Sequence, residues 1–256
     1  MLRAAMVAVL LLVPLVAAAC GGSSKSKAKA PPATGGASAI DAITAAAKKT
    51  EAAGTERLSV DASGTAGGQN LAVTGTGAFD APHRVGTLDV DFSDAGISTA
   101  IDAVLSGTDM YLKSPLFALM LPAGKSWLKL DLSKAGAANG LSLNTLLAQD
   151  PTQTLTSLQS LRGATAVGSE IVDGVATTHY RARTVAGSKP GTYDVWVGGD
   201  GYVHRLRSRL ASGSGTTSAA VTLTVDLSGF GKKVTVAVPP ASQTVVSNGS
   251  LPGLGG

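Results

Sequence analysis

The sequence predicts an α+β domain built mainly on antiparallel β-sheet. Runs of alternating apolar and polar residues recur from Arg57 to Val238, Gly-rich turns separate many of them, and only a few stretches have helical spacing. About ten strands with a few short helices fit either a sandwich of two sheets or one curved sheet with helices over its concave face. The alternation alone does not choose between these two architectures.

Residues 1–19 are typical of a lipoprotein signal peptide. Arg3 precedes the apolar run Ala4–Val16, and three small residues follow, directly before Cys20, the single cysteine of the chain. The run is shorter than the ~20 apolar residues that span a membrane, which disfavours an uncleaved membrane helix. A plain secretory signal with an unrelated cysteine is the other alternative. We predict lipid attachment at Cys20, which would anchor the protein on the extracytoplasmic face of the cell membrane.

The rest of the chain divides into three parts. Residues 20–37 form the lipidated N-terminus and a flexible tether, because a Gly/Ser/Pro/Lys composition buries too little apolar surface to fold. Residues 38–238 form one folded domain. Residues 239–256 are polar and rich in Gly and Pro, and we expect them to be a disordered tail.

The folded domain is expected to begin with a helix at Ser38–Ala53. Ser38 can cap it, Ile40, Ile43 and Ala47 share one face, and Gly54 ends it. Strands with one apolar and one polar face follow, with Ile97–Leu105 ambiguous between strand and helix. The predicted strands of this first half are Arg57–Ser63, Leu71–Phe79, Thr87–Phe92, Met110–Lys113 and Trp127–Leu132.

A helical block is predicted next, over Leu141–Ala148 and again from Asp150, where Pro151 and Gln153 complete a capping signal, to Arg162-Gly163. A β-meander follows. Its first turn, Asp173-Gly174, accepts positive φ at both central positions and suits a type I′ hairpin. The remaining predicted strands are Ser169–Val172, Val175–Val185, Tyr193–Val197, Tyr202–Leu210, Ala219–Leu227 and Lys232–Val238.

Composition and motifs exclude several classes of function. The net charge is +4 with 15% charged residues, which leaves no dense basic patch for nucleic acid. His83, His179 and His204 are isolated from one another and are interpreted as surface or half-buried polar residues, so no metal site is predicted. The chain contains no G-x-S-x-G elbow and no complete phosphate loop. We predict neither catalytic residues nor a cofactor, and therefore no enzyme.

A row of arginines allows two interpretations. Arg205, Arg207 and Arg209 alternate along one strand, and Arg181 and Arg183 extend the row from a neighbouring hairpin. The row could dock on anionic lipid head groups or phosphate. A solvated outer face that discourages edge pairing is the more common use of such a pattern.

The chain resembles a known family in its lipobox, in the strands Met110–Lys113 and Trp127–Leu132, in the helical block, and in the meander VDGVATTHY to YDVWVGGDGYVHRL. It is similar to the actinobacterial lipoproteins of the LppX/LprG/LprA/LprF group, over roughly Ile40 to Val238. The resemblance implies a strongly curved single sheet, a half-barrel like that of LolA and LolB, with a few helices over its concave face. It also implies an apolar cavity that binds lipids or lipoglycans.

The apolar strand faces would then line the cavity. Our first hypothesis is a membrane-anchored carrier that transports or presents a lipid or acylated lipoglycan at the cell envelope. The alternative is an envelope module with a filled core that binds protein rather than lipid. An envelope transporter or protein partner is left unidentified in both cases. The predicted cavity residues are Leu58, Val60, Leu71, Val73, Phe79, Leu88, Val90, Phe92, Val195, Val197 and Leu206.

Overall fold

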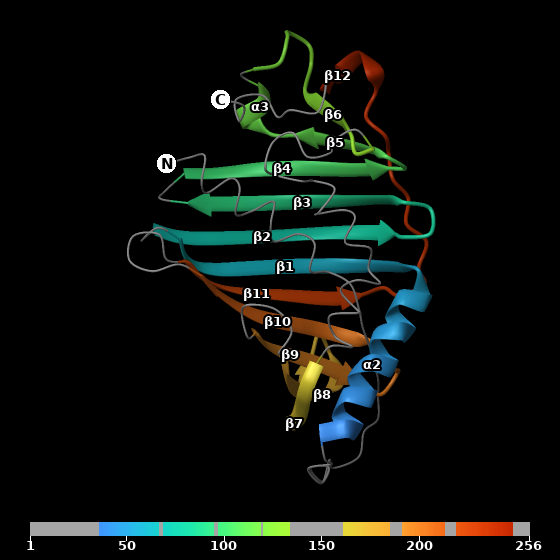
Figure 1. The fold of residues 1–256 in the computed structure, drawn as a ribbon. Helices are drawn as coiled ribbons and strands as arrows, with labels where there is room; N and C mark the ends of the chain where they lie inside the picture. Colours follow the sequence, from blue (N-terminus) through green and yellow to red (C-terminus); the bar gives the residue numbers. More distant parts are fainter. Residues whose placement is uncertain are drawn as a thin grey trace.

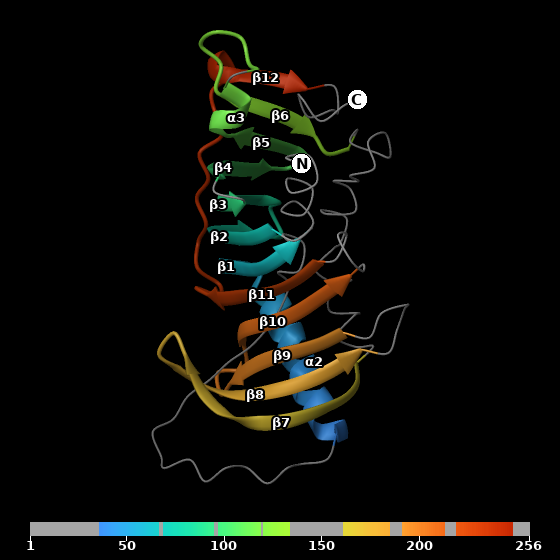
Figure 2. The same cartoon turned by 90° about the vertical axis from the view of Figure 1, so that its left-hand side faces the viewer.

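A single twelve-stranded sheet organises the molecule. The computed structural model describes residues 36–66, 69–94, 97–118, 120–133, 161–184, 191–212 and 219–247. The sheet is open and curls along its length, as the two views in Figure 1 and Figure 2 show. The prediction of an α+β fold on one curved antiparallel sheet is therefore confirmed, and the sandwich alternative is wrong.

The strands cover most of the described chain. They are β1 (Thr55–Ala66), β2 (Gln69–Asp80), β3 (Val85–Asp94), β4 (Ile97–Ser106), β5 (Asp109–Lys113), β6 (Trp127–Asp131), β7 (Leu161–Val172), β8 (Val175–Thr184), β9 (Gly191–Gly198), β10 (Val203–Ser212), β11 (Ala219–Ser228) and β12 (Thr244–Ser247). The described helices are α2 (Gly36–Ala53), the short α3 (Pro115–Ala118) and the 3-10 turn η3 (Ala241–Gln243). No helix in this part of the chain is long and apolar enough to cross a membrane.

Two meanders make up the sheet. Strands β1 to β6 pair in chain order, and so do β7 to β11. The antiparallel pair β1–β11 joins the two meanders, with Val60 opposite Val225. At the far edge β12 pairs with β6, and this pair is parallel.

Helix α2 packs on the second meander. It contains many alanines and ends at Gly54, whose φ of +69° is unfavourable for other residues. Ala39, Ile43 and Ala47 form a buried stripe that packs against β7–β10. The predicted helix Ser38–Ala53 is confirmed, although it begins two residues earlier, at Gly36.

The turn between β7 and β8 has the predicted type I′ geometry. Asp173 has a φ of +46° and Gly174 a φ of +81°. The flanking residues Val172 and Val175 are paired, so this turn fixes the register of the hairpin.

Several predicted elements differ from the structure. Lys232–Val238 is not a strand, because the chain after β11 runs past the ends of the other strands to the opposite edge (Figure 1). The disorder predicted for residues 239–247 is also wrong: Pro239 is buried, and η3 and β12 follow it. The predicted helical block lies mostly outside the described residues. Its last residues, Leu161 and Arg162, belong to β7, while the ambiguous stretch from Ile97 is the strand β4.

Close approach of β3 to β2 requires glycine at Gly77. A Cβ there would lie 2.5 Å from the Thr87 carbonyl oxygen and 3.2 Å from Leu88 Cδ1. We expect Gly77→Ala to lower the free energy of unfolding, measured by chemical denaturation, by about 1–3 kcal/mol, because backbone atoms must move apart. The matched control is Gly168→Ala in β7, where an added Cβ meets nothing within 4 Å. Equal losses in the two variants would contradict this explanation.

Candidate ligand-binding face

One face of the sheet carries buried apolar clusters from β7 to β6. On β1, Leu58 lies opposite Leu227 on one side and Gly77 on the other, and Gly77 lies opposite Leu88. Alternation along each strand then directs neighbouring apolar side chains to the same face. The face continues into a cluster on β5 and β6 that includes Leu112, Leu128 and the α3 residue Phe117.

All eleven predicted cavity residues lie on this apolar face. Eight are buried, and Phe79, Phe92 and Val197 are half-buried. Val195, Val197 and Leu206 belong to the cluster under α2. The other eight form the central cluster on β1, β2 and β3, where β11 contributes Leu223, Val225 and Leu227. The structure brings the predicted set together, and its role toward a ligand stays a prediction.

The described helices pack on only part of this face. Helix α2 contacts β7 to β10, and α3 contacts β4. The central cluster lies between these two regions and draws its own buried residues from β1, β2, β3 and β11. In the described part of the chain, the apolar face is therefore more extensive than the surface on which its helices pack.

Glu56 places a carboxyl group among the apolar side chains of β1. Glu56 alternates with Leu58 and Val60 along β1 and lies opposite the half-buried Phe79. Burial away from water raises the pKa of the Glu56 carboxyl to about 7, because desolvation disfavours the charged form. Sequence reasoning missed Glu56, although its alternation with Leu58 and Val60 was available as a signal.

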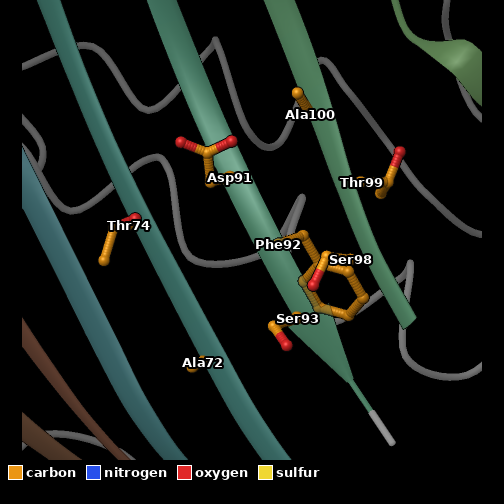
Figure 3. A pocket seen from close by; sticks show the side chains of 8 residues that line it. All are labelled: Ala72, Thr74, Asp91, Phe92, Ser93, Ser98, Thr99 and Ala100. Carbon is orange, nitrogen blue, oxygen red and sulfur yellow. The ribbon is translucent and has the colours of Figure 1, made fainter. Parts of the chain in front are cut away.

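A small pocket of about 280 Å³ opens on the opposite, polar face, between β2, β3 and β4 (Figure 3). Small or polar side chains dominate its lining, and Asp91 is its charged member. It is below the usual size of a small-molecule site. It is also separate from the predicted cavity, with which it shares only Phe92. The lining residues are Ala72, Thr74, Asp91, Phe92, Ser93, Ser98, Thr99 and Ala100.

A buried polar cluster, centred on His179, also lies on this outer face. Its ring stacks on Trp196, with centroids 4.2 Å apart. His179 Nε2 lies 2.9 Å from Asp194 Oδ1, and Nδ1 lies 3.0 Å from Glu170 Oε1 without the angle of a hydrogen bond. The expectation that the histidines are exposed or half-buried is wrong for His179 and for His204, both of which are 6% exposed. His83 is exposed and pairs with Asp80.

Arginines complete the cluster. Arg181 Nε donates to Asp194 Oδ1 at 2.9 Å, and Arg209 Nη1 to Asp194 Oδ2 at 3.5 Å. Desolvation opposes ionisation of Asp194, but the hydrogen bonds and charges of His179 and Arg181 outweigh it, so the pKa of Asp194 lies below its ordinary value. The groups near His179 are thus engaged with one another, and no group of residues in the described ranges has metal-binding geometry. Sequence reasoning missed this cluster because the β8–β9 register joins residues that are isolated in the sequence.

We compared the chain with known proteins in sequence and in structure. No family model matches the chain. The lipoprotein LprA of Mycobacterium tuberculosis (strain ATCC 25618 / H37Rv) is 33% identical over 129 residues, which cover 43% of this chain and 51% of LprA. A putative lipoprotein LprA of Mycobacterium bovis matches to the same extent. The chain thus spans about half the length of the curated relatives it matches.

Among solved structures, lipoprotein LppX of Mycobacterium tuberculosis aligns with a TM-score of 0.52 at 14% identity, over 78% of this chain and 99% of LppX. LprF from Mycobacterium bovis aligns with a TM-score of 0.48 at 13% identity, over 80% and 99% of the two chains. The likeness to LppX concerns the fold. The predicted resemblance to this group of lipoproteins is therefore confirmed, in sequence by LprA and in fold by LppX.

Proposed function

We propose that this protein is a lipoprotein, anchored through Cys20 on the extracytoplasmic face of the cell membrane, that binds an acylated lipid or lipoglycan on its apolar face. The observation that carries the proposal is the apolar surface of the curled sheet, which extends beyond the strands on which the described helices pack. Acyl chains need such a dry, concave surface, since each Å² of apolar area removed from water contributes about 25 cal/mol. Transport or presentation of the bound lipid at the envelope is part of the proposal.

The sequence relatives support the anchoring half of the proposal. LprA is named a lipoprotein, and the lipobox before Cys20 is the feature that lipid attachment would require. No reaction is proposed, because the polar groups gathered around His179 are engaged in ion pairs, stacking and hydrogen bonds with one another.

Lipid occupancy tests the proposal directly. A chain that begins at residue 20 and carries Cys20→Ser is expressed in an actinobacterial host, purified without detergent, and analysed by native mass spectrometry and by mass spectrometry of its organic-solvent extract. We expect a stoichiometric acylated lipid that survives washing. A folded protein that is empty, and stays empty when offered envelope lipids, would overturn the proposal in favour of an envelope module that binds protein.

A matched pair of variants locates the lipid. Ala103 is half-buried on the apolar face of β4, while Ala100 lies on the polar face of the same strand. We expect Ala103→Phe to lower lipid occupancy, because the ring takes space that the acyl chains would fill, and Ala100→Phe to leave occupancy unchanged. Equal occupancy in the two variants would show that the lipid is bound elsewhere.

A further inference from the structure

The charges on the outer, polar face of the sheet are distributed unevenly between the two meanders. One row of paired residues crosses five strands in the order Arg181, Asp194, Arg207, Thr224, Asp61. The arginines lie on β8 and β10. Exposed aspartates lie on β1 and β3, where Asp61, Asp89 and Asp91 have no cationic partner in the described ranges. The first meander also carries Arg57 on this face, and Lys113 and Lys129 pair there with Asp102 and Asp109. The first meander therefore has an excess of carboxylates on this face, and the second an excess of arginines.

Arginines outnumber the carboxylates in the basic region. Arg205 is neutralised by Asp226, with Nη2 and Oδ2 2.6 Å apart. Arg181 and Arg209 share the single carboxylate of Asp194. Arg207 has no carboxylate within ion-pair distance among the described residues, since its Nε donates to Thr224 Oγ1 and its guanidinium lies 5.0 Å from the centre of the Trp196 ring.

Arg183 adds a further unpaired cation. It is exposed, it follows Arg181 on the same face of β8, and no carboxylate pairs with it in the described part of the chain. The side chains of Arg181 and Arg209 are 45% and 58% exposed, so both are also open to a ligand from solvent. We define Arg181, Arg183, Arg207 and Arg209 as the arginine patch.

The start of the described chain lies at the same end of the sheet. Helix α2 begins at Gly36 beside β7 and runs toward β1, as both views of the fold show (Figures 1 and 2). Sixteen residues separate Cys20 from this point, counting Cys20 itself. The tether that their composition predicts would have a typical end-to-end distance of ~20 Å. An acyl group on Cys20 would therefore keep the β7–β10 end of the sheet, rather than the acidic end, close to the bilayer.

We propose that the arginine patch docks on the surface of an anionic phospholipid membrane. Guanidinium groups bind phosphate in bidentate geometry, and cations close to an anionic bilayer gain from its negative surface potential. The unpaired aspartates of β3 are repelled by the same surface, so the protein would sit with its second meander toward the membrane. This orientation rests on the anchoring at Cys20 proposed above. The docking itself does not, because it needs only the arginines.

Vesicle binding tests the docking without the anchor. The chain that begins at residue 20 with Cys20→Ser is mixed with vesicles of phosphatidylcholine alone, or of phosphatidylcholine with 30% phosphatidylglycerol, and bound protein is measured by cosedimentation. We expect binding to the anionic vesicles only, and loss of that binding in 0.5 M NaCl, where charges are screened within a few Å. Absence of binding to the anionic vesicles at low salt would overturn the proposal.

Two triple variants with the same change in net charge distinguish binding through the arginine patch from general attraction of a positively charged protein to the vesicles. Arg183→Gln/Arg207→Gln/Arg209→Gln removes most of the patch. Lys48→Gln/Lys232→Gln/Lys233→Gln removes exposed lysines of α2 and of the chain after β11. We expect affinity for the anionic vesicles to fall by tenfold or more in the arginine variant and by less than twofold in the lysine variant. Equal weakening would contradict docking through the patch.

Quenching of tryptophan fluorescence tests the proposed orientation on the membrane without any change to the arginines. Trp196 lies beneath the patch, and Trp127, the other tryptophan, lies on β6 at the far end of the sheet. In vesicles that contain a head-group spin-labelled lipid, the Trp127→Phe protein should be quenched more strongly than a Trp196→Phe protein. The opposite order would overturn the proposed orientation. Lipid occupancy of the apolar face is scored separately by mass spectrometry, so either proposal can fail alone.

Discussion

Replacement of Trp196 by alanine is expected to lower the free energy of unfolding by about 3–5 kcal/mol. The side chain is 1% exposed and stacks on His179 with an interplanar angle of 8°. Its Nε1 donates to Glu170 Oε2 at 2.8 Å, and two arginines lie over its ring. Truncation would leave a cavity and would also expose the ion pairs of His179 and Asp194 to water.

Urea denaturation followed by circular dichroism measures this loss. The control is Trp127→Ala, because Trp127 is half-buried near the edge of the sheet and its ring faces one lysine, Lys113. Its truncation should cost about 1–2 kcal/mol, in proportion to the smaller area buried. Trp196→Phe should fall between the two, since it keeps a stacked ring and loses the hydrogen bond to Glu170. A Trp196→Ala loss no larger than that of Trp127→Ala would show that the outer cluster does not stabilise the fold.

Substitution of Glu56 by glutamine is expected to stabilise the protein above pH 7. The pKa of this carboxyl is about 7 in the folded protein, against 4.5 as its ordinary value. Between these values the folded state holds a proton that the unfolded state has released, so stability is lost as the pH rises from about 4.5 to about 7. Glutamine carries no charge to desolvate. At pH 8 the variant should therefore exceed the parent by up to about 3 kcal/mol, whereas at pH 4 the two should be similar.

A series of denaturation curves from pH 4 to pH 8 measures the difference. Glu51→Gln, on α2, is the matched control, because it makes the same chemical change away from the apolar face of β1 and should leave the slope between pH 4.5 and 7 unchanged. If the parent and the Glu56→Gln protein lose stability in parallel over this interval, the carboxyl is hydrated in the folded state and the explanation by burial is wrong.

Local pattern predicted the strands well and their arrangement only in part. The alternation in Leu58, Val60 and Ala62 follows from a single strand and needs no knowledge of its partners. The β1–β11 pair, in contrast, joins residues such as Val60 and Val225 that no local signal connects. That pair joins the two meanders into one sheet. Because it could not be predicted, the alternation was equally compatible with a sandwich, and only the resemblance to a lipoprotein family favoured the curved sheet.

The candidate site shows the same division. The alternation of apolar and polar residues within each strand identified Leu71 and Val90 as residues of the apolar face. This signal is local to each strand and needs no knowledge of its partners. It did not identify Glu56, because the raised pKa of this carboxyl comes from desolvation in the folded protein. It also missed the contact of His179 with Asp194, because that contact depends on the register of β8 on β9. The strand β12 was missed because it is short and its parallel partner β6 is distant in sequence.

The position of α2 makes the two meanders interdependent. The helix precedes the first meander in the chain, yet its buried stripe packs on the second, against residues such as Val195 and Leu206. During vectorial emergence of the chain, the first meander can pair its strands while Ile43 still has no partner surface. The helix acquires its partner surface only after β10 has emerged, and β6 remains an open edge until β12 arrives. The sheet therefore gains its last strand only after residue 244 has emerged, long after the first meander can pair, and until then the β6 edge is open to other strands.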